Sequence, residues 1–295
     1  MAASAAAESG AGGPALPPGR DVELPGRGTT FVRQLPGPPG AATLVLLHGW
    51  TATADLNWFR CYNALGARFR VVALDLRGHG RGIRSRRAFR LADCADDAAA
   101  LVDALALGPV IPVGYSMGGP IAQLMWHRHR EMVAGMVLAA TARSFSTSAP
   151  EERLMWAGLS GLAMASRWAP PQARQWMGTQ FSSMRGRRYD DWAEAQIASH
   201  DWRAVFEAGR SIGRFSSTEW IGGVDVPAAV VVTDRDRVVP PRRQERLAAT
   251  IPGASVFHVD GDHDACVVRS TGFVPALVDA CVDVAQRARA RSGRY

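Results

Sequence analysis

Residues 110–119 read VIPVGYSMGG, and the fold of the whole chain can be inferred outward from this stretch. An apolar run of strand length opens it, glycines close it, and apolar residues at helical spacing follow. Within it, GYSMG (114–118) matches the pattern G-x-S-x-G. Between a strand and a helix, this pattern is typical of a sharp turn that exposes a serine at the edge of a sheet. A glycine-rich turn in an ordinary α/β domain is the alternative interpretation. We expect Ser116 to be the exposed serine.

The neighbours of Ser116 fit such a turn. Gly114 and Gly118 have no side chain to hinder a tight backbone, and a strained turn of this kind is typical of a working site. Met117 would open the following helix, where backbone N–H groups lack partners and attract negative charge. We therefore expect the Met117 amide to donate to an oxyanion.

Length and composition predict one large domain. The chain has 295 residues, of which 47% are hydrophobic, and no apolar run is long enough to span a bilayer. Residues 1–20 are rich in Ala, Gly and Pro and lack the apolar block of a signal peptide. We interpret them as a disordered tail and expect a cytoplasmic protein.

The net charge of +7 comes with no lysine at all. The arginines are scattered, apart from the runs 81–90 and 287–294, and no basic groove with interleaved aromatic residues is visible. We therefore predict no nucleic-acid partner. The four cysteines, Cys61, Cys94, Cys266 and Cys281, show neither CxxC nor metal-ligand spacing, so we expect unbridged thiols and no metal site.

Apolar runs of strand length alternate with segments of helical spacing, which predicts an α/β fold with a mostly parallel central sheet flanked by helices. The expected strands are a hairpin over 22–35 and the runs 43–47, 69–74, 110–115, 132–140, 226–232 and 254–259, and the expected helices are 55–65, 91–107, 241–250 and 265–290.

Between about residues 143 and 220 the strand-like runs disappear and tryptophan and methionine become frequent. We interpret residues 142–217 as a helical lid inserted into a core made of 21–141 and 218–295. Such side chains are usually interior, and some should line a pocket for an acyl or ring-shaped group.

From about residue 22 onward, the chain resembles the α/β-hydrolase superfamily. The matching pieces occur in the family's order: LHGW (47–50), DLRGHG (75–80), the 114–119 turn, Asp236 through Val239-Pro240, and GDH (261–263). The resemblance implies a nucleophile at Ser116, a general base at His263, an orienting acid at Asp236, and an oxyanion hole formed by the amides of Trp50 and Met117.

The residue types have a chemical reason. A serine hydroxyl is a weak nucleophile and needs a base within hydrogen-bond reach, and a carboxylate can fix the tautomer of that base. Asp234 is the rival of Asp236, but the spacing to Pro240 favours Asp236. Asp262 and Asp264 flank His263 too closely to be its partner.

Other conspicuous residues are interpreted as structural. Asp75 and His79 belong to a tight glycine-rich connection, in which the aspartate caps turn amides. His258 falls within the last expected strand as a core or face residue. Pro112 would remove a donor from a central strand, and we expect a local bulge there.

These observations predict a cofactor-free serine hydrolase that cleaves an ester, a thioester or a similar acyl bond of a small to medium, apolar substrate through an acyl-enzyme. Carbon–carbon bond hydrolysis and perhydrolase activity use the same three residues and stay open. A non-catalytic ligand-binding protein of the same fold is the alternative from another class. Ser116 argues against dehalogenases and epoxide hydrolases, which use an aspartate nucleophile.

Overall fold

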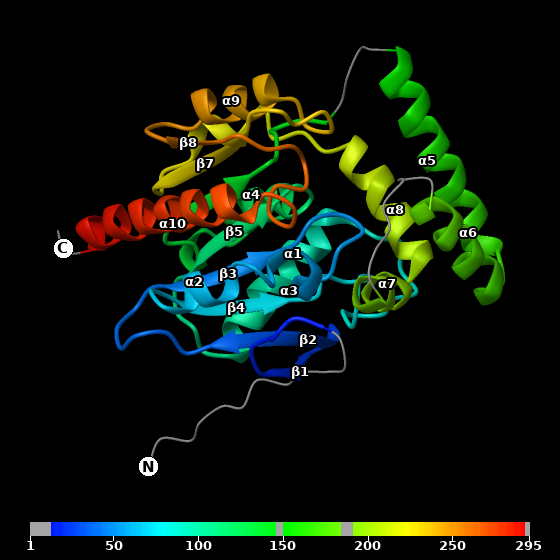
Figure 1. The fold of residues 1–295 in the computed structure, drawn as a ribbon, viewed down its shortest axis with the longest axis horizontal. Coiled ribbons are helices and arrows are strands. Elements are labelled where there is room, and N and C mark those ends of the chain that lie inside the picture. The colour runs from blue at the N-terminus through cyan, green and yellow to red at the C-terminus, as the bar shows by residue number, and fades with distance from the viewer. Residues whose placement is uncertain (1–12, 146–149, 184–190, 293–295) are drawn as a thin grey trace.

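The computed structural model describes residues 13–145, 150–183 and 191–292 (Figure 1). Within these ranges an eight-stranded sheet has the order β1-β2-β4-β3-β5-β6-β7-β8. β2 pairs in antiparallel fashion with β1 and β4, and all other neighbours are parallel. The strands are β1 (Gly19–Leu24), β2 (Gly28–Leu35), β3 (Thr43–Leu47), β4 (Arg70–Leu74), β5 (Ile111–Tyr115), β6 (Met136–Ala139), β7 (Ala228–Thr233) and β8 (Ser255–Val259).

Helices cover both faces of the sheet, because alternate side chains of each central strand point to opposite sides. Leu44 and Leu46 of β3 enter one core, and Val45 and Leu47 enter the other. This arrangement confirms the predicted fold class. The first core is covered by α1 (Ala54–Trp58), α2 (Tyr62–Gly66) and α10 (Ser270–Ser292), and the second by α3 (Leu91–Ala104), α4 (Gly118–Arg128) and α9 (Pro241–Thr250).

Several element boundaries differ from expectation, and the strand expected over 132–140 is confined to Met136–Ala139. The helix expected over 55–65 is two short helices, α1 and α2, and the helix expected from residue 265 begins at Ser270. The expected tail, 1–20, falls mostly outside the described residues, but Gly19 and Arg20 pair with β2. Short 3-10 turns, η1 (Arg130–Met132) and η2 (Ile221–Gly223), precede β6 and β7.

Pro112 does not produce a bulge on the β3 side, where Val45 stays in register with it. On the β6 side the pairing is split into an isolated bridge, Val110–Val133, and a ladder that starts with Val113 opposite Val137. Three residues along one strand thus oppose four along the other, so the expected local bulge lies on this side, with the extra residue ahead of β6. The missing N–H of Pro112 explains the interruption. In a parallel sheet the backbone groups of alternate residues point to the same neighbouring strand, so those of Pro112, like those of Val110, point toward β6.

A helical insertion lies between β6 and β7 and groups to one side of the sheet (Figure 1). Trp202 is buried in it, but Trp168, Trp176 and Met164 are exposed, contrary to the expected interior role of such residues. The side chains of Met155, Trp156 and Met184 lie outside the described residues. The insertion comprises α5 (Pro150–Trp168), α6 (Pro171–Ser183), α7 (Asp191–Ala198) and α8 (Trp202–Gly213).

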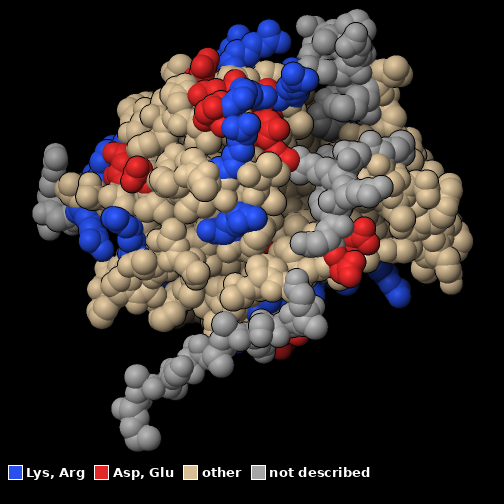
Figure 2. Space-filling view, viewed as in Figure 1, with Lys and Arg blue, Asp and Glu red and all other residues tan. Residues whose placement is uncertain are grey.

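On the face shown in Figure 2, basic and acidic side chains are mixed rather than gathered into one basic surface. None of the four cysteines forms a disulfide, and all four are buried. Among the described residues, no helix is long and apolar enough to cross a membrane.

Three buried histidines join the core to the insertion. The ring centroids of His48 and His79 are 5.3 Å apart, and those of His79 and His200 are also 5.3 Å apart. His48 accepts the Leu76 N–H at 2.9 Å, and His200 accepts the Gly80 N–H at 2.9 Å. Burial, with smaller contributions from the neighbouring histidines and, for His79 and His200, from Arg84, lowers the pKa of each histidine to about 3. The three rings are therefore neutral.

These histidines should make folding stability depend on pH. In the unfolded chain each takes up a proton near pH 6.5, whereas in the folded chain each stays neutral down to about pH 3, so stability is lost as the pH falls below 6.5. At about pH 5 the loss is roughly 2 kcal/mol per histidine. Burial raises the pKa of Asp75 to about 6, which offsets the loss by only about 1 kcal/mol. We expect the urea midpoint to be lower at pH 5 than at neutral pH.

His200→Asn should reduce this pH dependence, because it removes one of the three titrating rings. The fold should be kept, because an asparagine oxygen can still accept the hydrogen bond from the Gly80 N–H. His258→Asn, on the exposed surface, is the matched control for the loss of one histidine. A urea midpoint that is equal or higher at acidic pH would contradict the role given to the three rings.

Candidate active site

The turn between β5 and α4 holds Ser116 in the left-handed backbone region, with φ 51°. This conformation is rare for a residue that is not glycine and marks a strained position. The Ser116 N–H donates to Ala139 O at 2.9 Å, and the Thr141 hydroxyl donates to Ser116 O at 2.8 Å. Both partners come from the end of β6 and the loop after it, so the neighbouring strand holds the turn in place.

The two motif glycines are required by close packing. A Cβ atom on Gly114 would lie 2.3 Å from the Gly118 carbonyl oxygen, and one on Gly118 would lie 2.0 Å from the Leu47 carbonyl oxygen. No side chain can be accommodated at such distances. The sequence-based reason for these glycines, a tight turn, therefore agrees with the packing.

The predicted serine, histidine and aspartate form a continuous chain of hydrogen bonds. Ser116 Oγ lies 2.8 Å from His263 Nε2, and His263 Nδ1 lies 2.8 Å from Asp236 Oδ2. Ser116 follows β5, Asp236 follows β7 and His263 follows β8, so the carboxyl ends of three parallel strands bring them together. With Nδ1 facing a carboxylate, the imidazole presents Nε2 as an acceptor for the serine hydroxyl.

Asp236 is buried, with 3% of its surface exposed, and its carboxylate is fully supported. The amides of Val238 and Val239 each donate to Oδ1 at 2.8 Å. The Thr233 hydroxyl donates to Oδ2 at 2.9 Å, and the Gln244 side chain donates to it at 3.3 Å. A buried carboxylate needs such donors, which also fix its direction toward the histidine.

Tyr115 adds a contact that sequence reasoning missed. Its buried hydroxyl donates to the His263 carbonyl oxygen at 2.7 Å, and burial raises the pKa of Tyr115 well above its usual range, so the hydroxyl stays a donor. Tyr115, Thr233 and Gln244 carried no signal in the sequence. The first occupies a variable position of G-x-S-x-G, and the other two meet Asp236 only in the folded chain.

The rival carboxylates lie elsewhere. Asp234 contacts Nδ1 of His258 at 2.7 Å on the exposed surface, and Asp262 contacts the amide of Asp264 at 3.4 Å. Asp75 has the predicted structural role, since it accepts the amides of Ala54 and Arg81, each at 2.8 Å.

The loop after β3 approaches Ser116 closely. A Cβ atom on Gly49 would lie 3.5 Å from the Ser116 Cβ atom, and the Gly49 amide is bound by Asn57 at 2.9 Å. Trp50 follows and donates its indole N–H to Val205 O of α8 at 2.7 Å. Met117 is buried and stands at the start of α4. The two predicted oxyanion residues thus occupy the segments that flank the serine.

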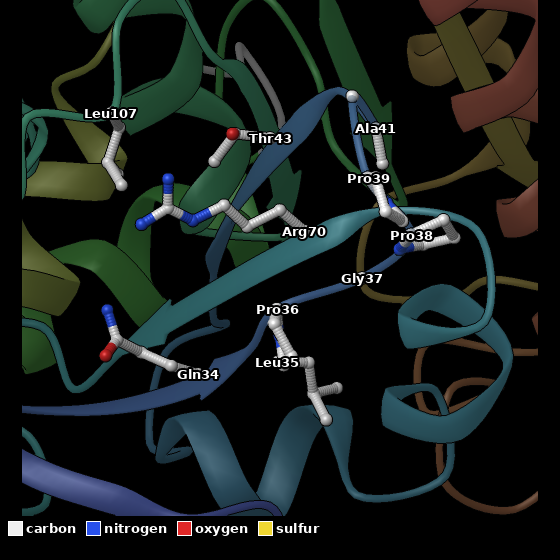
Figure 3. Close-up of a pocket in the computed structure, with 11 residues that line it drawn as sticks. Gln34, Leu35, Pro36, Gly37, Pro38, Pro39, Ala41, Thr43, Arg70 and Leu107 are labelled. Atoms are coloured by element: carbon white, nitrogen blue, oxygen red, sulfur yellow. The ribbon is translucent and has the colours of Figure 1, made fainter. Parts of the chain in front are cut away.

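A hollow of about 690 Å³ lies at the opposite end of the sheet; Figure 3 shows the residues that line it. Thr43 and Arg70 line it at the amino ends of β3 and β4, together with the proline-rich loop 36–41. It is therefore remote from Ser116. No three His, Cys, Asp or Glu side chains in the described part of the chain are grouped as metal ligands.

A family model described as alpha/beta hydrolase fold matches residues 42–270. A poly(3-hydroxyalkanoate) depolymerase of Ectopseudomonas oleovorans is 27% identical, over 91% of this chain and 94% of its own. A pimeloyl-[acyl-carrier protein] methyl ester esterase of Neisseria meningitidis is 28% identical, over 74% of this chain and 83% of its own.

A solved esterase from Thermogutta terrifontis superposes with a TM-score of 0.71 at 23% identity, covering 90% of this chain and 99% of the other. A hydrolase from Pseudomonas aeruginosa superposes with a TM-score of 0.73 at 20% identity, covering 89% and 98%. These two likenesses concern the fold. The family model spans most of the chain and shows that this protein belongs to the α/β-hydrolase family.

Proposed function

We propose that this protein is a serine esterase that cleaves an ester or similar acyl bond of a small to medium, apolar substrate through an acyl-enzyme on Ser116. The observation that carries the proposal is the hydrogen-bond chain from Ser116 through His263 to Asp236, with 2.8 Å at each step. No other described arrangement near the β5–α4 turn joins a hydroxyl, an imidazole and a buried carboxylate.

In this reaction His263 Nε2 accepts the Ser116 proton as Oγ attacks the acyl carbon, and a tetrahedral oxyanion forms. The proton then passes from Nε2 to the leaving alcohol, whose departure leaves the acyl group on Oγ. Water, activated by the same imidazole, releases the acid and restores the serine. Asp236 stabilises the imidazolium without taking its proton.

The oxyanion is assigned to the amides of Trp50 and Met117. Both belong to segments that flank Ser116, and the Met117 amide lies at the positive end of α4. Two donors aimed at the developing charge are each worth about 3 kcal/mol of barrier.

The preference for an apolar group rests on the insertion. We assign residues 142–217 as a lid that covers the site around Ser116. Phe181 of α6 lies 5.5 Å from Trp50, ring to ring, and Met177 and Leu162 border the same cluster. A lid with this inner surface favours an alkyl or aromatic acyl group over a charged one.

Replacing Ser116 should abolish hydrolysis, and replacing Asp236 should slow it severely. Ser116→Ala should leave no measurable turnover of p-nitrophenyl butyrate and no labelling by a fluorophosphonate. Asp236→Asn should lower kcat by about 10³- to 10⁴-fold, because the imidazole then lacks the carboxylate that holds it in the correct tautomer and stabilises the imidazolium. Steady-state kinetics and gel fluorescence measure both effects.

Asp234→Asn is the matched control, since it changes the neighbouring strand-end aspartate, and it should retain kcat within about twofold. Loss of activity in this variant together with retention in Asp236→Asn would overturn the assignment. Wild-type protein that neither hydrolyses p-nitrophenyl esters nor reacts with the fluorophosphonate would overturn the esterase proposal itself.

Chain length tests the substrate preference. Along p-nitrophenyl esters from acetate to decanoate, we expect kcat/KM to rise by about tenfold per two buried methylenes until the lid space is filled. Phe181→Ser should flatten that rise while leaving the acetate rate close to wild type. Equal kcat/KM for all chain lengths would contradict an apolar acyl pocket.

A further inference from the structure

A second hollow, about 640 Å³ in volume, lies where the insertion meets the loop after β4. Three separate segments form it: the loop at 84–86, the end of α5 with the start of α6, and the first turn of α8. Its wall carries five arginines and one tryptophan, namely Arg84, Arg86, Arg167, Trp168, Arg174 and Arg203.

Acidic side chains balance only part of this positive charge. Asp201 lines the pocket, but its carboxylate caps α8 by accepting the amides of Arg203 and Ala204. Glu207 lies 3.2 Å from the Arg203 guanidinium and 3.6 Å from that of Arg167. Among the described residues, five guanidinium groups therefore face two carboxylates, which leaves a concave surface with a net positive charge.

Part of this wall is held firmly. Arg84 donates to the carbonyl oxygens of Gly78 and Gly80, and Arg203 donates to Glu207 and to the Ser85 carbonyl. Arg86 is different, because within the described residues its side chain has no hydrogen bond or ion pair, although it lines the pocket. Its planar group is available for a ligand.

Trp168 stands in the same wall with 86% of its surface exposed. A tryptophan with so much apolar surface in water is unusual, and its flat indole beside guanidinium groups offers a stacking surface. Cationic groups with an aromatic face are the combination that recognises phosphate and base together.

We propose that this pocket binds a nucleotide, with the arginines holding its phosphates and Trp168 stacking on its base. Guanidinium groups bind phosphate oxygens in pairs of parallel hydrogen bonds. The volume of about 640 Å³ is in the range of small-molecule sites. The inference does not rest on the proposed esterase activity, because none of the lining residues belongs to the assigned active site.

Isothermal titration calorimetry of the full chain with ADP, pyrophosphate and adenosine tests this site, in about 50 mM salt so that charge is little screened. We expect ADP to bind more tightly than pyrophosphate, and adenosine to bind more weakly than both. ADP affinity should fall steeply as salt is raised.

Three variants separate the contributions. Arg86→Gln should weaken ADP and pyrophosphate binding by about tenfold, as expected for loss of a charge-assisted hydrogen bond. Trp168→Ala should weaken ADP binding but not pyrophosphate binding. Arg68→Gln, an exposed arginine outside the pocket, is the matched control and should change neither affinity by more than about twofold.

No ADP binding at about 1 mM ligand would overturn the proposal, as would equal effects of Arg86→Gln and Arg68→Gln. ADP and pyrophosphate affinities that are equal and insensitive to Trp168→Ala would overturn the nucleotide assignment. Because Arg86 and Trp168 are exposed side chains, circular dichroism of the variants should match wild type, so a negative result cannot be attributed to unfolding.

Discussion

The left-handed backbone at Ser116 is the constraint on which the site depends. A residue with a side chain adopts φ 51° only where its surroundings impose it, and here β3 and β6 do so from both sides. The Leu47 carbonyl leaves room for nothing larger than glycine at position 118, and Thr141 binds the serine carbonyl. The serine thus projects from a turn that the centre of the sheet makes rigid.

The parallel sheet brings the residues of the site together around that turn. Successive strands end at one edge, so segments more than a hundred residues apart in the sequence meet beside β5. Asp236 can be buried there because four donors, two from backbone amides, compensate the loss of water. Tyr115 binds the backbone of His263, so the strand that precedes Ser116 also positions the imidazole.

The insertion is attached to the same loops that surround the serine. The Trp50 indole N–H donates a hydrogen bond to the Val205 carbonyl of α8, and His200 accepts one from the Gly80 N–H in the turn after β4. The neutral histidine rings between these loops form a buried contact that depends on their staying unprotonated. The position of the insertion is therefore coupled to the loop that carries the assigned oxyanion donor.

From the sequence alone the class of fold could be predicted, because strands buried on both faces are apolar throughout, and so could Ser116, because the motif around it is local. Asp236 and His263 were implied by the resemblance to the α/β-hydrolase superfamily, and the folded chain brings both within hydrogen-bond reach of the turn. The sequence did not determine where Pro112 would interrupt the sheet, or that Trp168 would face water, since the orientation of a helix depends on what packs against it. Nor did it predict the arginine-lined pocket or the donors to Asp236. Those groups come from segments far apart in the chain, and only tertiary packing brings them within hydrogen-bond distance.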